Sequence, residues 1–228
     1  LIKLFNAILS SGCFPLQWAT GLIVPIFKKG GREEPGNYRG ISLISVMCKV
    51  FSGVLLNRLN FWADAVNFFC QEQAGFRKGF RTTDNVFILH TVINKYLSRK
   101  KGRLYVAFID FRKAFDSISH QLLITKLKDA GITGNILEVL RSMYMQLHAH
   151  VKTPNGVTKS FPCMSGVQQG SLLSPFLFNL FLNSLSQQLN SPGVQKTQLA
   201  NAYINHLLYA DDLALISDTV FGLSLIHI

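Results

Sequence analysis

The chain has 228 residues, which is enough for one large domain or two small ones with a sizeable core. Its 48% hydrophobic content is high, but the most apolar stretch, residues 172–185, is too short to span a bilayer and excludes a membrane-spanning role. The net charge of +11, from 23 Lys and Arg against 12 Asp and Glu, favours a polyanionic partner such as nucleic acid. A basic protein without such a partner is the alternative.

The basic residues are unevenly distributed along the chain. Nineteen of the 23 precede Asp129, in clusters that include residues 28–32, 77–81 and 99–103. The last cluster fits a solvated helix end, because cations are favourable near a helix C-terminus. The first two remain candidates for contact with phosphates.

The four cysteines are widely spaced in mostly apolar surroundings, without zinc-site spacing. They indicate reduced core thiols of an intracellular protein. His148 and His150 would share one side of a strand, and without further ligands they are interpreted as structural. The chain begins in a helical pattern without an initiator Met or a signal peptide. We therefore expect it to be part of a longer protein.

Periodicity predicts the elements of the first half. Residues 28–38, rich in Gly, Pro and charge, predict an exposed loop. Apolar residues at helical spacing predict helices over 51–62 and 84–100, the second ending at Gly102. The short apolar run 104–109 before Asp110 predicts a strand buried on both faces.

Turn and cap signals organise the second half. Ser119 can cap a helix that runs to Ala130 and stops at Gly131. The remaining expected elements are a helix over 135–147, strands over 149–153 and 157–161 around a turn at 153–156, a helix from Ser174, and a hairpin of 207–209 with 213–216. This mixture predicts an α+β fold in which helices pack on a small antiparallel sheet.

Acidic residues stand at two points in otherwise apolar strand sequence. Asp110 ends the predicted strand, and Asp211 and Asp212 occupy the tip of the predicted hairpin. Crowded carboxylates repel one another and are stabilised by a divalent cation, and Mg²⁺ prefers such hard oxygen ligands. Two such ions can activate a hydroxyl and stabilise a leaving group. Either feature alone is weak, and together they leave polymerases, nucleotide cyclases and other two-metal enzymes open.

Five segments in order resemble the motifs of reverse transcriptases, specifically those of non-LTR (LINE-type) retrotransposons. They are NYRGISL (37–43), QAGFRKGFRTTD (73–84), FIDFRKAFDSI (108–118), SGVQQGSLLSPFLFNLFLN (165–183) and LLYADDLALIS (207–217). Together they are spread over residues 37–217, which is most of the chain. Two positions depart from the pattern, with Gly40 where many relatives have Pro and Gln168 in place of a frequently basic residue.

The resemblance implies a right-hand polymerase with fingers and part of the palm over 1–103, the palm with its catalytic motifs over 104–223 and an atypical tail over 224–228, without a thumb. It implies that Asp110 and Asp211 hold two Mg²⁺ ions, replaceable by Mn²⁺, with Asp212 beside them. The carbonyl of Phe111 would be a further ligand.

The resemblance also implies roles in substrate binding. Phe115 would exclude a ribose 2′-hydroxyl, although a core Phe is the alternative. Gln169 and Gly170 would line the incoming nucleotide. Lys28 and Arg39, two basic residues of the fingers, would clamp its triphosphate. The residues that would contact template and primer are the tyrosine of the hairpin, Tyr209, and three basic residues for which only their charge argues, Arg77, Lys78 and Arg81.

The implied reaction is RNA-templated DNA synthesis, in which a primer 3′-hydroxyl attacks the α-phosphate of a deoxynucleoside triphosphate. The expected partners are an RNA template, a DNA primer, deoxynucleotides and the thumb and endonuclease regions of the same polyprotein. The expected location is intracellular, in cytoplasm and nucleus as a ribonucleoprotein. We expect the chain alone to be nearly inactive. A group II intron-type enzyme and a non-catalytic nucleic-acid-binding remnant are the alternatives.

Overall fold

A computed structural model describes residues 1–224 and divides the chain into two compact units. Unit 1 comprises Leu1–Trp62 and Phe115–Phe178, and unit 2 comprises Ala63–Ala114 and the chain from Asn179 onward. The functional labels fingers and palm follow a different division, with its boundary after residue 103, and they stay predictions. The expected tail lies largely outside the described residues.

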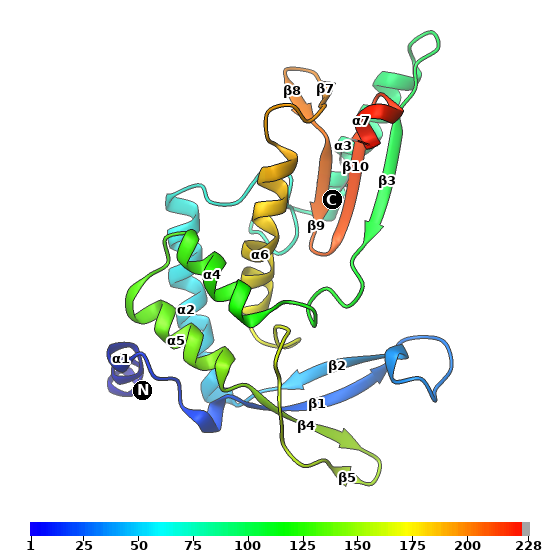
Figure 1. Ribbon diagram of the computed structural model, residues 1–228. Helices are drawn as coiled ribbons and strands as arrows, with labels where there is room; N and C mark the ends of the chain where they lie inside the picture. Colours follow the sequence, from blue (N-terminus) through cyan, green and yellow to red (C-terminus); the bar gives the residue numbers. More distant parts are fainter. Residues whose placement is uncertain (225–228) are drawn as a thin grey trace. The chain divides into compact units, whose positions relative to one another are not determined.

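Unit 1 contains a five-stranded sheet (Figure 1). Its strands are β1 (Thr20–Phe27), β2 (Tyr38–Leu43), β4 (His148–Thr153), β5 (Gly156–Val157) and β6 (Phe161–Pro162). The order is β2-β1-β4-β5, and β6 pairs with β4. Because β1 pairs in parallel with β4, this sheet is mixed rather than antiparallel. The sequence did not predict β1, since Gly21 and Pro25 interrupt its strand pattern.

The sequence predicted the helices of unit 1 except the short η1. They are α1 (Ile2–Ser11), η1 (Leu16–Trp18), α2 (Val46–Ala65), α4 (His120–Asp129) and α5 (Gly134–Met145). The Ser119 hydroxyl accepts a hydrogen bond from the Leu122 N–H at 3.4 Å, which confirms the predicted cap. Phe51 lies fully buried against the rings of Phe5 and Trp18. The loop between β1 and β2, with η2 (Pro35–Asn37), is largely exposed as predicted.

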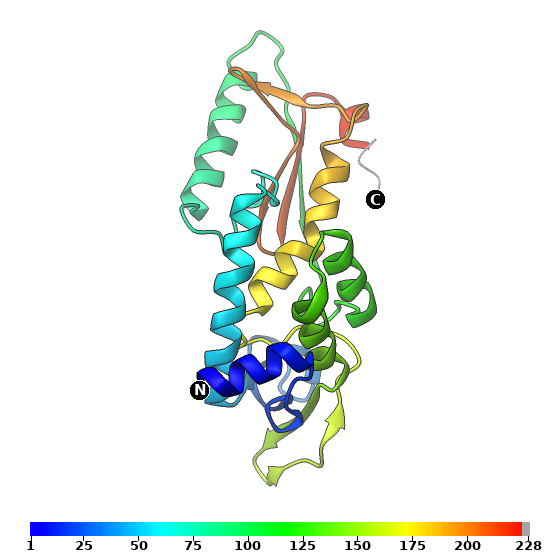
Figure 2. The same ribbon diagram turned by 90° about the vertical axis from the view of Figure 1, so that its left-hand side faces the viewer.

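Unit 2 is built on the antiparallel sheet that the sequence predicted. Its strands are β3 (Tyr105–Asp110), β10 (Asp212–Ser217) and β9 (His206–Tyr209), in the order β3-β10-β9. The other elements are α3 (Thr82–Leu97), the second half of α6 (Ser174–Leu189), α7 (Val220–Ser224) and a small hairpin of β7 (Thr197–Leu199) and β8 (Ala202–Ile204). Figure 2 shows α3 on one face of the sheet and α6 on the other.

Alternating side chains of the three strands form two apolar layers. On the α3 face, Leu207, Ala214 and Ile216 pack with Val92 and Tyr96. On the α6 face, leucines of β9 and β10 pack with Leu189. This alternation fixes which strand residues point to which helix.

The prediction that the strand before Asp110 is buried on both faces was wrong. β10 is the central strand and is buried, whereas β3 lies at the edge of the sheet. Phe108 is therefore 76% exposed. A short apolar run does not distinguish a central from an edge strand, because that depends on partners distant in sequence.

The structure also shows the surroundings of the cysteines and of the two neighbouring histidines. Cys48 is buried as expected, but Cys13 is exposed, so it is not a core residue. The Nδ1 atoms of His148 and His150 each lie 2.8 Å from a backbone carbonyl oxygen, consistent with structural roles. Within residues 1–224, no helix is both long enough and apolar enough to cross a bilayer.

His206 forms a buried polar network in unit 2. Its Nε2 lies 2.6 Å from the Ser186 hydroxyl, and its Nδ1 lies 2.6 Å from the Asn205 side-chain oxygen. Burial lowers the pKa of His206 to about 4, with Glu72 opposing this shift and Lys196 adding to it. The folded protein therefore holds the imidazole in its neutral form.

We expect stability to fall as the pH drops from about 6.5 to about 4. In this window His206 is protonated in the unfolded chain but not in the folded chain. Lowering the pH therefore reduces the free energy of unfolding by about 3 kcal/mol. Urea unfolding across this pH range measures the effect. His206→Gln should flatten the pH dependence relative to the unchanged chain, and His90→Gln, at an exposed position of α3, should not. Equal pH slopes for all three proteins would refute the assignment.

Candidate active site

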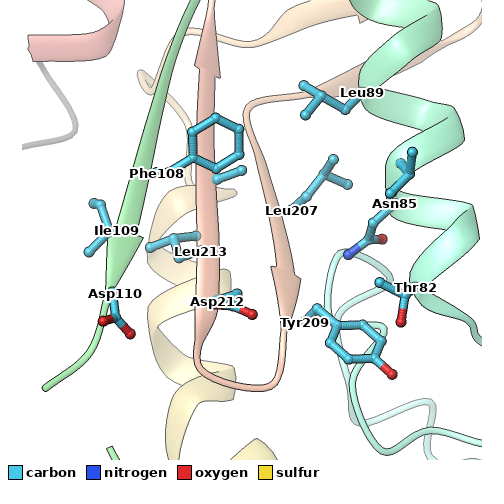
Figure 3. A pocket seen from close by; sticks show the side chains of 12 residues that line it. Thr82, Asn85, Leu89, Phe108, Ile109, Asp110, Leu207, Tyr209, Asp212 and Leu213 are labelled. Atoms are coloured by element: carbon cyan, nitrogen blue, oxygen red, sulfur yellow. The ribbon is translucent and has the colours of Figure 1, made fainter. Parts of the chain in front are cut away.

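The β3, β10 and β9 strands bring two predicted carboxylates together. In the antiparallel register, Asp212 pairs directly with Asp110 on one side and with Tyr209 on the other. Directly opposed residues of antiparallel strands point to the same face, with Cα atoms about 5 Å apart. Figure 3 shows Asp110 and Asp212 on neighbouring strands at the same end of the sheet. Residues 102 positions apart in sequence (212 − 110) thus become neighbours.

The third carboxylate, Asp211, lies in the hairpin turn. Ala210 and Asp211 form the two-residue link between β9 and β10, and Ala210 has a φ of +56°. Glycine favours this left-handed conformation, and an alanine there costs about 1 kcal/mol. Asp110 and Asp212 are therefore the directly opposed pair, with Asp211 adjacent in the turn.

The carboxylates are available as cation ligands. Among residues 1–224, none of the three accepts a hydrogen bond or forms a salt bridge. The same residues contain no group of three or more His, Cys, Asp or Glu side chains that could hold a metal ion, so Asp110, Asp211 and Asp212 do not form such a group. The opposed pair Asp110 and Asp212 by itself fits an open site, where Mg²⁺ keeps several water or phosphate oxygens, rather than a closed protein cage.

A cavity of about 350 Å³ lies beside the carboxylates within unit 2. Its walls come from β3, β9, β10 and the first turns of α3 (Figure 3). Leu89, Phe108 and Leu207 make it largely apolar, while Asp110 and Asp212 contribute charge. Asp110 and Asp212 thus line a recess rather than a flat surface.

The predicted triphosphate ligands lie together in unit 1. Arg39 pairs with Ile26 across the β1–β2 ladder, and Lys28 follows β1 at the same end. The Lys28 N–H donates to the Asn37 carbonyl at 2.9 Å, which closes the loop. Both side chains are exposed. The register therefore gathers two cations at one end of this hairpin.

The predicted nucleotide-lining loop packs on β2. The Ser42 N–H donates to the Gln169 carbonyl at 2.7 Å, and Gly170 has a φ of +126°. A Cβ at Gly170 would lie 2.5 Å from the Ser42 carbonyl oxygen, so only glycine permits this approach. The Gln169 amide donates to Asp116 at 3.2 Å.

Phe115 has a packing partner in unit 1. Its ring stacks on Phe178 with centroids 4.5 Å apart and planes 6° apart. Phe115 remains only partly buried. A structural role and the predicted exclusion of a 2′-hydroxyl are compatible with this position. Its role in substrate selection stays a prediction.

Arg77 is engaged within its own loop. Its guanidinium donates to the carbonyls of Cys70 at 2.8 Å and Gln73 at 3.1 Å, and it stacks 4.2 Å from the Phe80 ring. Burial lowers its pKa. Lys78 and Arg81 carry no such contacts to carbonyls, and template contact stays a prediction for all three basic residues.

Two polar residues that the sequence did not predict as functional support the hairpin. Gln73 hydrogen bonds to Ala210, and Asn85 donates to the Leu208 carbonyl at 3.0 Å. Gln73 stands in a recognised motif, but nothing local indicates a partner 137 residues away. Polar residues of this kind need the structure to reveal their role.

The fold is similar to that of telomerases of known structure. Apo telomerase from Candida tropicalis matches with a TM-score of 0.67 and 14% identity, over 98% of this chain and 45% of that chain. A form truncated of its C-terminal domain matches with a TM-score of 0.66 and 17% identity, over 91% and 45%. The chain therefore shares its α+β fold with these telomerase structures.

Residues 26–222 match the family described as reverse transcriptase (RNA-dependent DNA polymerase). The chain belongs to this family. In Drosophila melanogaster, the probable RNA-directed DNA polymerase from transposon BS is 33% identical over 95% of this chain, and the Pol polyprotein of R2DM is 30% identical over 99%. These relatives identify a LINE-type reverse transcriptase domain. The chain covers 23% and 21% of their lengths.

We expect saturating Mg²⁺ to raise the free energy of unfolding, because a ligand that binds only the folded state stabilises it. Asp110→Asn should remove most of this gain. Without Mg²⁺, the variant should be about 0.5 kcal/mol more stable, since like charges directly opposite each other destabilise a sheet. Urea unfolding with and without Mg²⁺ measures both effects. Asp129→Asn, at the exposed end of α4, is the control, and an equal Mg²⁺ gain in both variants would contradict the site.

Proposed function

We propose that the chain is the polymerase part of a retrotransposon polyprotein and adds deoxynucleotides to a primer 3′-hydroxyl by copying RNA. The supporting observation is the register that opposes Asp110 and Asp212 beside a cavity. Membership of the reverse transcriptase family gives this pair its chemical context. A carboxylate pair without that context would fit several classes of two-metal enzyme.

The carboxylates are proposed to hold divalent cations together with Asp211 and the Phe111 carbonyl. Two Mg²⁺ ions at such a site supply activation of the primer hydroxyl and charge stabilisation of the pyrophosphate. The protein positions these ligands on a packed sheet, and a rigid support suits a reaction that depends mainly on alignment.

Unit 1 is proposed to bind the incoming nucleotide. Lys28 and Arg39 offer a point charge and a bidentate donor for a triphosphate. The Gln169–Gly170 backbone is fixed against β2 and would support the base and sugar. Lys78, Arg81 and Tyr209 would contact template and primer, mainly through backbone charge and stacking.

The wider context is also a proposal. The chain covers about a fifth to a quarter of its curated relatives, and thumb and endonuclease regions would be supplied by the rest of such a polyprotein. Action inside cells as a ribonucleoprotein follows from that setting. A non-catalytic remnant would bind RNA without extending a primer, and a group II intron-type enzyme would have a flanking ribozyme.

We expect the 228-residue chain alone to extend a DNA primer on an RNA template poorly. Extending the chain with the downstream region of its natural reading frame should restore synthesis. In that longer protein, Asp211→Asn should reduce synthesis by about 10³-fold, because lost charge stabilisation is worth several kcal/mol. RNA binding, measured by fluorescence anisotropy, should persist. Synthesis that survives Asp211→Asn would exclude the proposed chemistry.

Phe115→Val in the longer protein should admit ribonucleotides. Removing the proposed clash should change the deoxy-to-ribo ratio of kcat/KM by about 10–100-fold, as expected for a difference of one small group. Phe178→Leu removes the stacking partner but keeps Phe115, so it controls for lost packing. Single-nucleotide incorporation assays give the ratio. An unchanged ratio in Phe115→Val would show that this ring is only a core residue.

A further inference from the structure

The loop from Cys70 to Arg81 extends the catalytic sheet of unit 2. The Leu208 N–H donates to the Glu72 carbonyl at 2.9 Å, and the Ala74 N–H donates to the Leu208 carbonyl at 2.9 Å. These bonds form a parallel bridge between Gln73 and Leu208. The loop therefore lies along the free edge of β9, next to the hairpin turn.

The Gln73 side chain hydrogen bonds to both backbone groups of Ala210, the turn residue with positive φ. Its side-chain oxygen accepts from the Ala210 N–H at 3.1 Å, and its side-chain nitrogen donates to the Ala210 carbonyl at 3.3 Å. The same oxygen accepts from the Gly75 N–H at 2.8 Å. Gln73 is only 3% exposed and Ala210 only 7%. A primary amide is suited to this position, because it offers a donor and an acceptor at once.

The backbone around Gln73 is itself held by two side chains. Arg77 donates to its backbone carbonyl at 3.1 Å, and the buried Asn179 side chain donates to the Gly75 carbonyl at 2.7 Å. A Cβ at Gly75 would overlap the backbone nitrogen of Ala210. The loop thus approaches the turn as closely as a glycine backbone allows.

We infer that Gln73 is a positioning residue for the proposed carboxylate site. Ala210 adopts a φ of +56° that alanine does not favour, and its two peptide planes determine how Asp211 and Asp212 leave the turn. By bonding on both sides of Ala210, Gln73 selects this conformation over the relaxed alternatives. Gln73 touches neither carboxylate, so it acts only through the turn. This inference rests on the proposed function for its catalytic consequence.

Hydrogen exchange tests the hydrogen bonds between Gln73 and Ala210 without any catalysis. In Gln73→Met the amide of Ala210 loses its buried acceptor, and its exchange should accelerate at least about tenfold, as for an opened local structure. The amides of Leu213 to Ile216 in β10 should keep their protection. Gln187→Met, at an exposed position of α6, is the matched control and should change neither. Unchanged exchange at Ala210 would overturn the inference.

Kinetics in the longer protein test the consequence. Gln73→Met should lower kcat by about 10–100-fold, as when a supporting contact of a metal ligand is lost. The KM for deoxynucleotides should stay within about twofold, and the Mg²⁺ concentration for half-maximal rate should rise. Gln73→Glu keeps the acceptor but loses the donor, and its kcat should lie between that of the unchanged longer protein and that of Gln73→Met.

The outcomes separate the two proposals. If the unchanged longer protein does not extend primers, the proposed function fails while the exchange experiment still decides the role of Gln73 at the turn. If it extends primers and Gln73→Met retains kcat and the Mg²⁺ requirement, the positioning role is overturned. Gly75→Ala, which drives the loop from the turn, should reproduce the Gln73→Met pattern, and a normal kcat in it would count equally against the inference.

Discussion

The register between β3 and β10 is the constraint on which the site depends. Asp212 pairs with Asp110 only because Ala214 pairs with Phe108 and Ile216 with Val106 on the same face. A slip of one residue would turn every β10 side chain to the opposite face. Such a slip would exchange the β10 residues that pack on α3 with those that pack on α6, so neither apolar layer would keep its packing. Core packing therefore fixes the position of two carboxylates that would repel each other.

The active end of the sheet combines several locally unfavourable features. Two acids lie opposite each other, Ala210 adopts a left-handed conformation, and the edge of β9 would be open without the loop at Gln73. Each of these features lowers the stability of the fold. Rules that predict structure from locally favourable sequence are expected to be wrong at such positions. Buried amides compensate here, because they satisfy backbone groups that the short hairpin leaves unpaired.

Much of the fold could be predicted from sequence because its signals are local. The Ser119 cap, the stop at Gly131 and the hairpin around Asp211 depend on neighbouring residues, and the structure agrees with each. The edge position of β3, the parallel pairing of β1 with β4 and the role of Gln73 depend on partners far along the chain. No periodicity encodes such a partner. For the proposed site, the sequence predicted the acids, whereas their register and the residues that support them required the structure.

Three glycines of the sequence motifs allow these segments to approach one another closely. Gly75 admits the backbone of Ala210, and Gly170 admits the backbone of Ser42. Gly166 lies against Asp116, where a Cβ would approach its Cα to 2.9 Å. In each case the glycine lets one motif touch another within the same unit, and the polar residue beside it makes the hydrogen bond. A side chain at any of these three glycines would therefore push apart segments that carry the proposed site residues.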